Sequence, residues 1–308
     1  MRLYANLHNH STHSDGVYSP AELVRVAKKE GLGAIAVTDH DTATGYPELA
    51  EECKKQGMES IFGVEFTAPS DFNRHGFHIV GFDFDPEYPA MAEYLHGMSF
   101  RETDQTRQLF ERGLASGYLH DITWQEVLDY NGSITWLCNE QVFRAMKAKG
   151  IFKDTDYYDF FHTVYGPHRG KIPPAYPFLP ASKMVELINK AGGFAVLAHP
   201  HNQLEDVPKL MELGLRGLEV WHHDLPDEAE RRAALTIAME NNLFVSGGED
   251  HSGLCGGQYA RYENPRESHH YAEPLTLGTT KFFFDEIKTR TLSKDRDAVL
   301  REILAGEV

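Results

Sequence analysis

Short apolar runs separated by amphipathic segments occupy both ends of the chain. The runs lie at residues 3–7, 33–38, 60–67, 77–82, 194–198, 216–221 and 243–246. Several are continuously apolar, which is typical of buried parallel strands, and helices are predicted between them. The first predicted helix has a serine, proline and glutamate start signal at residues 19–22 and ends at Gly31. Strands and helices that alternate in this way predict an α/β fold with a mainly parallel sheet.

Residues 100–178 interrupt this alternation, because they contain helical patterns and no clear strand. We therefore predict a discontinuous barrel of residues 1–99 and 179–308. Residues 100–178 are predicted to form a helical insertion that acts as a lid or substrate-binding subdomain over the mouth of the barrel.

Composition narrows the range of functions. With 30 basic and 46 acidic residues, the chain has a formal net charge of −16, which disfavours binding to duplex nucleic acid. No apolar run approaches the ~20 residues of a membrane helix, and the N-terminus lacks a signal-peptide pattern, so no membrane association is expected. The three dispersed cysteines fit no metal or redox motif. We expect a cytoplasmic protein with a small-molecule substrate, and the oligomeric state stays open.

Residue types that bind metals gather at the predicted strand ends. His8 and His10 are two residues apart on the first strand, so both imidazoles can point to one site. The other candidates follow later strands: Asp15, His40, Glu65, His78, His199, His251 and one acid from Glu249 or Asp250. In a (β/α) barrel these strand ends converge on one face, which favours a barrel over an open sheet.

Nine candidate ligands are more than one zinc ion takes, and they suit two or three divalent ions that share a bridging carboxylate. Imidazoles and carboxylates without thiolates are suitable ligands for zinc, manganese or iron. The sequence does not distinguish among these three metals.

The motifs together resemble the polymerase and histidinol phosphatase (PHP) family. The matching segments are His8-Asn-His10, Ser14-Asp-Gly16, Thr38-Asp-His40, Gly63-Val-Glu65, His78 before Gly81, Leu197-Ala-His-Pro200 and Ser246-Gly-Gly-Glu-Asp-His251. The resemblance implies a distorted seven-stranded (β/α) barrel with a trinuclear metal site. It assigns His8, His10, Glu65 and the acid near residue 249 to one ion, Glu65, His78 and His199 to a second, and Asp15, His40 and His251 to a third.

The acid after the last strand is the point at which spacing and residue type disagree. The related branch of the family has Asp-x-His there, so residue type selects Asp250, whereas the i, i+2 spacing to His251 selects Glu249. We predict Glu249, because spacing on an extended segment decides which side chain reaches the metal. His13 has no counterpart in the family pattern and is predicted to bind no metal.

Within the family, the helical insertion and the run at 191–200 resemble stand-alone nucleoside 3′,5′-bisphosphate phosphatases and 5′ exonucleases. Phe143-Arg144 and Gly170-Lys171 match that branch, which implies that Arg144 and Lys171, with the adjacent Arg169, bind substrate phosphate. The Arg and His that the branch tends to carry around residues 139–141 are absent. This departure argues for a different phosphate ester, for example a cyclic one.

The resemblance implies a phosphoesterase that hydrolyses a small phosphorylated metabolite, such as a nucleotide, a sugar phosphate or a cyclic phosphate, by attack of a metal-bridging hydroxide on phosphorus. His201 and His223, with the neighbouring His222, follow strands and are candidate proton donors to the leaving group. One alternative is an amidohydrolase, which shares the His-x-His pair but expects a bridging lysine that is not found. The other is a non-catalytic metal-binding module like the PHP domains attached to polymerases.

Overall fold

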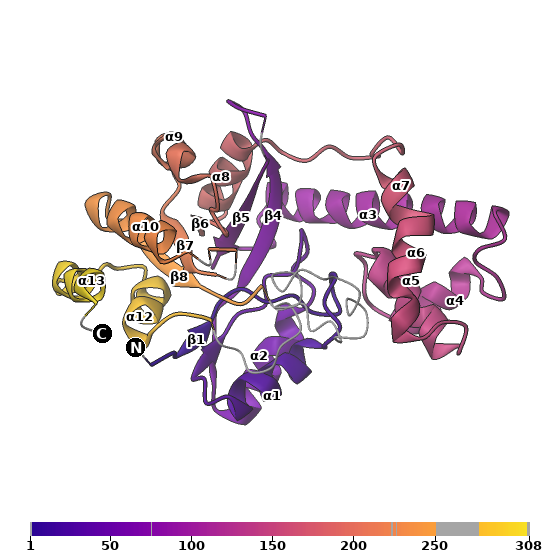
Figure 1. Ribbon diagram of the computed structural model, residues 1–308, viewed down its shortest axis with the longest axis horizontal. Helices are drawn as coiled ribbons and strands as arrows, with labels where there is room; N and C mark the ends of the chain where they lie inside the picture. The colour runs from indigo at the N-terminus through magenta and orange to yellow at the C-terminus, as the bar shows by residue number, and fades with distance from the viewer. Residues whose placement is uncertain (1, 75, 223, 226, 251–276, 307–308) are drawn as a thin grey trace.

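The protein consists of a mixed α/β body that one long helix joins to a group of shorter helices (Figure 1). The computed structural model describes residues 2–74, 76–222, 224–225, 227–250 and 277–306. Two of the predicted site residues, His223 and His251, lie outside the described residues.

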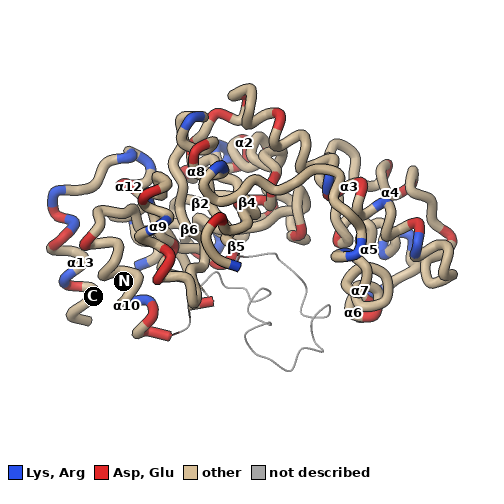
Figure 2. Tube along the Cα trace, turned by 90° about the horizontal axis from the view of Figure 1, so that it is seen from above, with Lys and Arg blue, Asp and Glu red and all other residues tan. Residues whose placement is uncertain are grey.

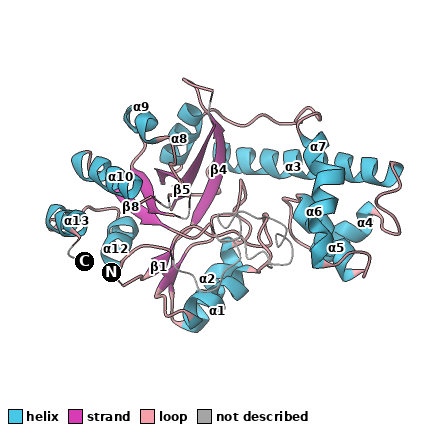
Figure 3. Cartoon of the chain, viewed as in Figure 1, coloured by secondary structure: helices cyan, strands magenta, loops and turns pink. Residues whose placement is uncertain are grey.

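The strands form two sheets, drawn in magenta in Figure 3. The first is a parallel sheet in the order β1–β2–β3, with bounds Ala5–Asn6, Ala34–Ile35 and Glu59–Ser60. The second has the order β4–β5–β6–β7–β8, with bounds Gly63–Pro69, Gly76–Phe82, Phe194–Leu197, Gly217–Trp221 and Phe244–Gly247. The prediction of a mixed α/β fold is confirmed.

The second sheet departs from the predicted parallel arrangement. β4 pairs antiparallel with β5, and β5 pairs antiparallel with β6, whereas β6, β7 and β8 are parallel. The prediction is wrong for β5 because residues 70–75 are too short a connection for the crossover that parallel strands need. The predicted strand at 60–67 is also divided between β3 and β4, with a break at Ile61 and Phe62.

Backbone hydrogen bonds link the two sheets at both edges. Glu65 N donates to Thr38 O at 3.2 Å, which ties the chain after β2 to β4. Leu7 N donates to Gly247 O at 3.1 Å, which ties the chain after β1 to β8. Among the described residues the strands therefore form two linked sheets, and the closed seven-stranded barrel is not confirmed.

Helices cover the outer faces of both sheets. The predicted start of the first helix is confirmed, because Ser19 and Glu22 form a reciprocal capping box. The first sheet carries α1 (Pro20–Lys29) and α2 (Tyr46–Gln56), and the second sheet carries α8 (Ala181–Lys190), α9 (Val207–Glu212), α10 (Glu228–Glu240), α12 (Lys281–Thr289) and α13 (Arg296–Ala305).

The remaining helices have a hydrophobic core of their own. They are α3 (Pro89–Ala115), α4 (Trp124–Asn131), α5 (Asn139–Ala148), α6 (Tyr157–Phe160) and α7 (Gly166–Arg169), with a π-helical turn at Phe161–Tyr165. The start of α3 packs Met91 and Met98 into the core of the α/β body, whereas its end packs Leu109 and Phe110 into the helical core. The predicted boundary at residues 99 and 100 therefore falls inside a continuous helix.

Acidic and basic residues both occur along the outer helices (Figure 2). Within the described part of the chain, every helix is too short or too polar to cross a membrane.

Gly248 allows β8 to approach the first strand closely. A Cβ atom at this position would lie 2.3 Å from the Cβ of His8 and 2.4 Å from its backbone nitrogen. Because neither atom can move without shifting the strand, we expect Gly248→Ala to lower the free energy of unfolding by about 1–3 kcal/mol, measured by urea denaturation. Gly170→Ala is the matched control, because a Cβ there meets no heavy atom within 4 Å. Equal urea midpoints for the two variants would contradict this packing argument.

Candidate metal centre

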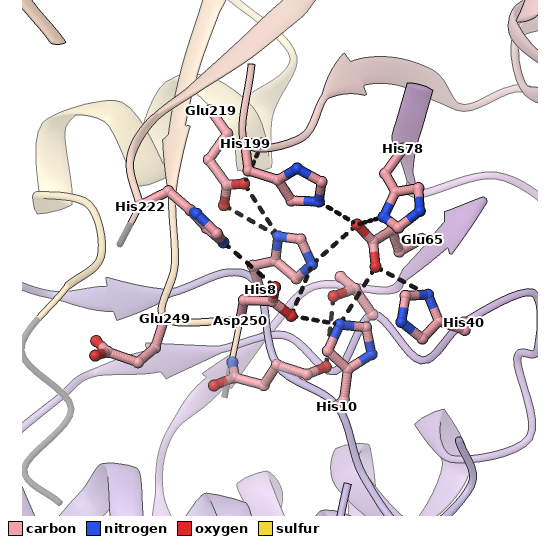
Figure 4. A network of polar contacts seen from close by, with 12 residues as sticks. His8, His10, His40, Glu65, His78, His199, Glu219, His222, Glu249 and Asp250 are labelled. Carbon is pink, nitrogen blue, oxygen red and sulfur yellow. Dashed lines mark hydrogen bonds and ion pairs between the residues drawn. The ribbon is translucent and has the colours of Figure 1, made fainter. Parts of the chain in front are cut away.

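Glu65 lies at the middle of a cluster of histidines (Figure 4). Its side chain is 1% exposed. Five imidazole nitrogens lie within 3.3 Å of its two carboxylate oxygens, and they belong to His8 and His10 at 3.3 Å and to His40, His78 and His199 at 3.0 Å. Residues from five separate segments of the chain therefore meet at one buried carboxylate.

The backbone brings each histidine to Glu65 in a different way. His8 and His10 alternate along the segment after β1 and point to the same side, with ring centroids 5.3 Å apart. His40 forms a parallel β-bridge with Glu65 itself. On β5, His78 pairs with Thr67, so it shares one face of the sheet with Glu65 two residues earlier.

His199 reaches the cluster from a strained backbone position. It follows β6 with a φ of 26°, which a residue with a β-carbon rarely adopts. Its backbone nitrogen donates to a carboxylate oxygen of Glu219 at 2.9 Å, and this hydrogen bond helps to hold the turn.

Electrostatics in the cluster favour bound cations. Burial opposes the charge of Glu65, but the imidazoles of His8, His78 and His40 outweigh burial and hold its pKa well below the usual value. Burial likewise opposes protonation of His8, yet Glu219 and Glu65 raise the pKa of that imidazole well above its usual value. Charges that retain protons on these nitrogens also attract divalent ions, which compete with protons for the same atoms.

Several polar atoms that face the centre of the cluster have no hydrogen bond of acceptable geometry. They are Nε2 of His8, Nε2 of His10, Nδ1 of His40 and Oε2 of Glu65, and all are buried. Buried polar atoms without a partner are costly, so a structure that keeps several together calls for a ligand. Coordination to metal ions would satisfy these atoms.

Four overlapping groups have ligand atoms close enough to share an ion, within 4.8 Å of one another. They are His8, His10, Glu65 and Asp250; His8, Glu219 and His222; His10, Asp15 and His40; and His40, Glu65 and His78. The residues thus fit more than one divalent ion, and Glu65 belongs to two of the groups.

Asp250, and not Glu249, points into the cluster (Figure 4). A carboxylate oxygen of Asp250 lies 2.8 Å from Nε2 of His10, whereas Glu249 Oε2 accepts a hydrogen bond from Leu277 N at 2.7 Å. The prediction of Glu249 as the metal ligand assumes an extended backbone at residues 249–251, but Asp250 has a φ of 51°. Because the chain turns at this residue, the alternation of side chains along a strand does not apply.

Glu219 and His222 belong to the cluster, although neither was among the predicted metal ligands. Glu219 on β7 is 2% exposed, and its two oxygens lie 3.2 and 3.0 Å from Nδ1 of His8. Burial raises its pKa, but His8 and His222 outweigh burial and lower it. The sequence does contain a signal for Glu219, which is a charged residue in the middle of a predicted apolar strand. A buried charge of this kind needs a partner.

A cavity of about 290 Å³ opens beside the cluster and extends to the helical core. Asp15, His40 and His78 line its metal-binding end. The α/β body and the insertion supply the other walls, which include Arg101, Glu102, Trp136, Asn139, Glu140, Tyr157, Phe161, Arg169 and Phe178. The cavity is large enough for a small organic molecule next to the cluster.

The three cations predicted to bind phosphate lie in different surroundings. Arg169 lines the cavity, and its Nη2 lies 2.6 Å from a carboxylate oxygen of Glu102. Arg144 does not line the cavity, because its guanidinium donates to the backbone carbonyls of Gly16 and Thr12. Lys171 is exposed and also lies outside the cavity lining.

The predicted proton donors are not brought to the cavity by the described residues. His201 is exposed, and its Nδ1 lies 2.9 Å from a carboxylate oxygen of Glu230 on α10. His223 cannot be placed, because it lies outside the described residues. His13 lies apart from the cluster, and its Nδ1 forms a hydrogen bond with Thr44 Oγ1 at 2.8 Å.

Comparisons with known proteins agree with the geometry. A family model described as the PHP domain matches residues 6–149. The phosphoribosyl 1,2-cyclic phosphate 1,2-diphosphodiesterase of Eggerthella lenta is 28% identical over 257 residues, which cover 82% of this chain and 95% of that protein. A 5′-3′ exoribonuclease of Haemophilus influenzae is 32% identical over 199 residues, which cover 63% of this chain and 68% of that protein.

A solved structure is similar over almost the whole chain. It is a protein from Bifidobacterium adolescentis described as a metal-dependent phosphoesterase, with 27% sequence identity and a TM-score of 0.73. The match covers 96% of this chain and 98% of that protein.

The mixed α/β fold, the histidine–carboxylate cluster and these relatives define a phosphoric ester hydrolase with a metal-binding site. The chain belongs to the PHP family. The family and the enzyme class predicted from the sequence motifs are therefore both confirmed.

The geometry at residues 249 and 250 leads to a direct test. We expect Asp250→Asn to weaken the binding of Mn²⁺ at least about 10-fold, because the variant removes a charged oxygen from the cluster. Glu249→Gln should bind Mn²⁺ like the unmodified protein, because its carboxylate faces Leu277. Calorimetric titration of the metal-free proteins measures both effects. The assignment fails if Glu249→Gln loses affinity and Asp250→Asn does not.

Proposed function

We propose that this protein hydrolyses a small phosphorylated metabolite, such as a nucleotide, a sugar phosphate or a cyclic phosphate, with the help of two or three divalent ions. The observation that carries the proposal is the buried Glu65 carboxylate surrounded by five imidazoles beside a cavity that contains two guanidinium groups. The metal would be zinc, manganese or iron, because the donors are imidazoles and carboxylates.

The proposed ligand sets combine contacts of the described residues with the assignments that the family resemblance implies. His8, His10, Glu65 and Asp250 would hold one ion, and Glu65, His78 and His199 a second. Asp15 and His40 would hold a third, together with His251. Asp250 takes the role that the sequence motifs assigned to Glu249. Glu219 would orient His8, because it binds Nδ1 of the ring, whereas Nε2 faces Glu65.

The bound ions would supply the activated water and the positive charge that phosphate ester hydrolysis requires. The protein itself would bind and orient the ester. Trp136, Tyr157 and Phe161 line the cavity, so they would cover the organic part of the substrate and exclude bulk water from the reacting group. His223 stays a candidate proton donor to the leaving group, and His201 is a weaker one because it pairs with Glu230.

Arg101 on α3 is a better candidate for binding substrate phosphate than Arg144 or Lys171. It lines the cavity, its guanidinium lies 3.8 Å from the ring centroid of Phe178, and one nitrogen donates to Tyr176 O. Its buried Nε has no hydrogen bond, and Arg101 forms no ion pair with the described residues. A planar cation fixed in this way can bind a phosphate group in a directional manner. Arg169, which pairs with Glu102, would be the second cation.

The proposal also includes the finer features of the molecule. The two linked sheets would be a distorted form of the seven-stranded barrel of the family. Residues 100–178 would act as the lid and the substrate-binding subdomain, because they supply most of the cavity wall away from the cluster. We propose a cytoplasmic location, where both a phosphorylated metabolite and reduced thiols are found.

Glu65 provides the central test of the proposal. We expect Glu65→Ala to lose most of the bound metal and to lower the rate of phosphate release by at least about 100-fold, because the carboxylate belongs to two of the proposed ligand sets and contacts His40 of the third. Elemental analysis and a phosphate assay measure the two effects on the same preparation. Glu212→Ala, at an exposed position on α9, is the control. Full metal content and full rate in Glu65→Ala would refute the proposed site.

The substrate class is tested with a panel of compounds on the unmodified protein. The panel contains nucleoside monophosphates and bisphosphates, sugar phosphates, cyclic phosphates and a set of amides, each with added Mn²⁺ or Zn²⁺. Phosphate release or ring opening is the expected result. Cleavage of amides alone would indicate an amidohydrolase. Stoichiometric metal without hydrolysis of any compound would indicate a binding module.

For Arg101, we expect Arg101→Met to raise KM for the best phosphorylated compound about 10-fold or more, because a charge-assisted hydrogen bond contributes about 1.5–3 kcal/mol. The metal content of this variant should not change. Lys171→Met, which changes an exposed cation outside the cavity, should leave KM within about twofold, since exposed charges contribute little. The reverse pattern would restore Lys171 as the phosphate-binding residue.

A further inference from the structure

Three backbone carbonyl groups of the loop at residues 12–16 face α5 of the insertion. Gln141 Nε2 donates to Thr12 O at 3.1 Å and to Ser14 O. Arg144 donates through Nη2 to Thr12 O at 3.3 Å and through Nη1 to Gly16 O. Two side chains, one turn apart on the same helix, therefore hold the carbonyl groups at alternate positions of one short loop.

The opposite side of this loop is attached to the α/β body. Ser14 Oγ donates to a carboxylate oxygen of Asp39 at 2.6 Å. Asp15 lies between the two attachments, and its two oxygens lie 3.7 Å from His10 Nδ1 and 3.8 Å from His40 Nε2. The loop thus connects the insertion with one of the proposed metal ligands.

Few contacts from the described part of the chain fix the Asp15 side chain directly. It is 36% exposed, and the nearest hydrogen bond to its carboxylate is a long one of 3.4 Å from Ser14 Oγ. The position of the carboxylate is therefore set by the backbone of the loop. The turn after it is tight, because a Cβ on Gly16 would lie 2.1 Å from His10 O. A small shift of this backbone would move Asp15 away from His40.

We propose that Gln141 and Arg144 are positioning residues of the metal centre, which hold Asp15 where it can bind the ion shared with His40. The inference rests on the proposed function, because it takes Asp15 as a metal ligand. It gives Arg144 a role other than binding phosphate. Both terminal nitrogens of Arg144 donate to backbone carbonyls, and the side chain lines a separate hollow with Val17 and Tyr18.

The same helix also reaches the substrate cavity. Asn139 and Glu140 at the start of α5 line the cavity, while Gln141, the next residue, and Arg144, one turn further on, hold the loop. The insertion is then more than a cover over the cavity, because the metal centre lacks its full geometry without α5. A ligand that contacts Asn139 and an ion bound by Asp15 share one rigid element, so each should favour the binding of the other.

The test is the number and affinity of bound Mn²⁺ ions in the full-length protein, measured by elemental analysis and by calorimetric titration. Asp15→Asn defines the ion that depends on Asp15. We expect Arg144→Gln to weaken the same ion at least tenfold and to leave the other ions at the affinity of the unmodified protein. General unfolding would instead release every ion, so the selective loss separates positioning from a merely structural role.

Two further variants complete the design. Arg144→Lys retains one donor, so it should fall between the unmodified protein and Arg144→Gln, and it keeps the proposal testable if Arg144→Gln is insoluble. Arg107→Gln is the control, because this exposed arginine on α3 pairs only with Asp104 and Glu111 among the described residues.

The outcomes separate the inference from the proposed function. Full ion affinity in Arg144→Gln and Arg144→Lys, together with loss of one ion in Asp15→Asn, overturns the inference and leaves the metal site intact. Unchanged metal binding in Asp15→Asn overturns both the inference and the assignment of Asp15 as a ligand. Selective loss of the same ion in Asp15→Asn and Arg144→Gln supports both.

Discussion

The structure depends on one constraint, which is the burial of the Glu65 carboxylate at 1% exposure. A buried charge is stable only with opposite charges or hydrogen-bond donors around it, and five imidazoles supply them here. His8 and His10 come from one segment of the chain, and each of the other three imidazoles comes from a segment of its own. The arrangement of both sheets is thus tied to a single side chain. Divalent ions would offset the remaining cost, because they would satisfy the nitrogens and the oxygen that protein hydrogen bonds leave unpaired.

The surroundings of the cluster are built to keep its ligands in place. Glu219 binds the ring nitrogen of His8 that faces away from Glu65 and also the backbone of His199, so one carboxylate orients two histidines. Gly248 permits the close approach of β8 to His8, and Asp39 ties the loop that contains Asp15. The distances in the cluster depend on these residues.

Much of this arrangement could be predicted from the sequence where a local rule applies. The two-residue period of a strand predicted that His8 and His10 point the same way, and apolar runs located most of the strands. The rule failed at Glu249 because the chain turns at Asp250, and a positive φ at a non-glycine residue leaves no clear sequence signal. The prediction of a parallel sheet failed at β5 because apolar periodicity does not indicate strand direction. The short connection at 70–75 does indicate it, since parallel strands need a longer crossover.

Long-range partners were the features that the sequence concealed. Glu219 joins the histidine cluster only because β7 places it beside His8, 211 positions earlier in the chain. Arg144 and Lys171 carry the right charge for phosphate, but charge alone does not determine what a side chain faces. Arg101 lies in no sequence motif, and nothing in its local sequence indicates that its helix borders the cavity. The surroundings of these residues depend on tertiary contacts. A family resemblance predicts such contacts only at positions that match the family motifs.

The metal-binding cluster and the cavity have different structural requirements, and α5 contacts both parts. The metal cluster must keep its geometry, whereas the cavity wall formed by the insertion can change with the substrate. α5 serves both, because Asn139 and Glu140 face the cavity and Gln141 and Arg144 hold the loop of Asp15. Relatives of this chain include a cyclic phosphate diphosphodiesterase and an exoribonuclease, which act on different esters. A helix that contacts both parts can change at Asn139 and Glu140 only while Gln141 and Arg144 still hold the loop, and this restricts how a new substrate specificity can arise on the same metal centre.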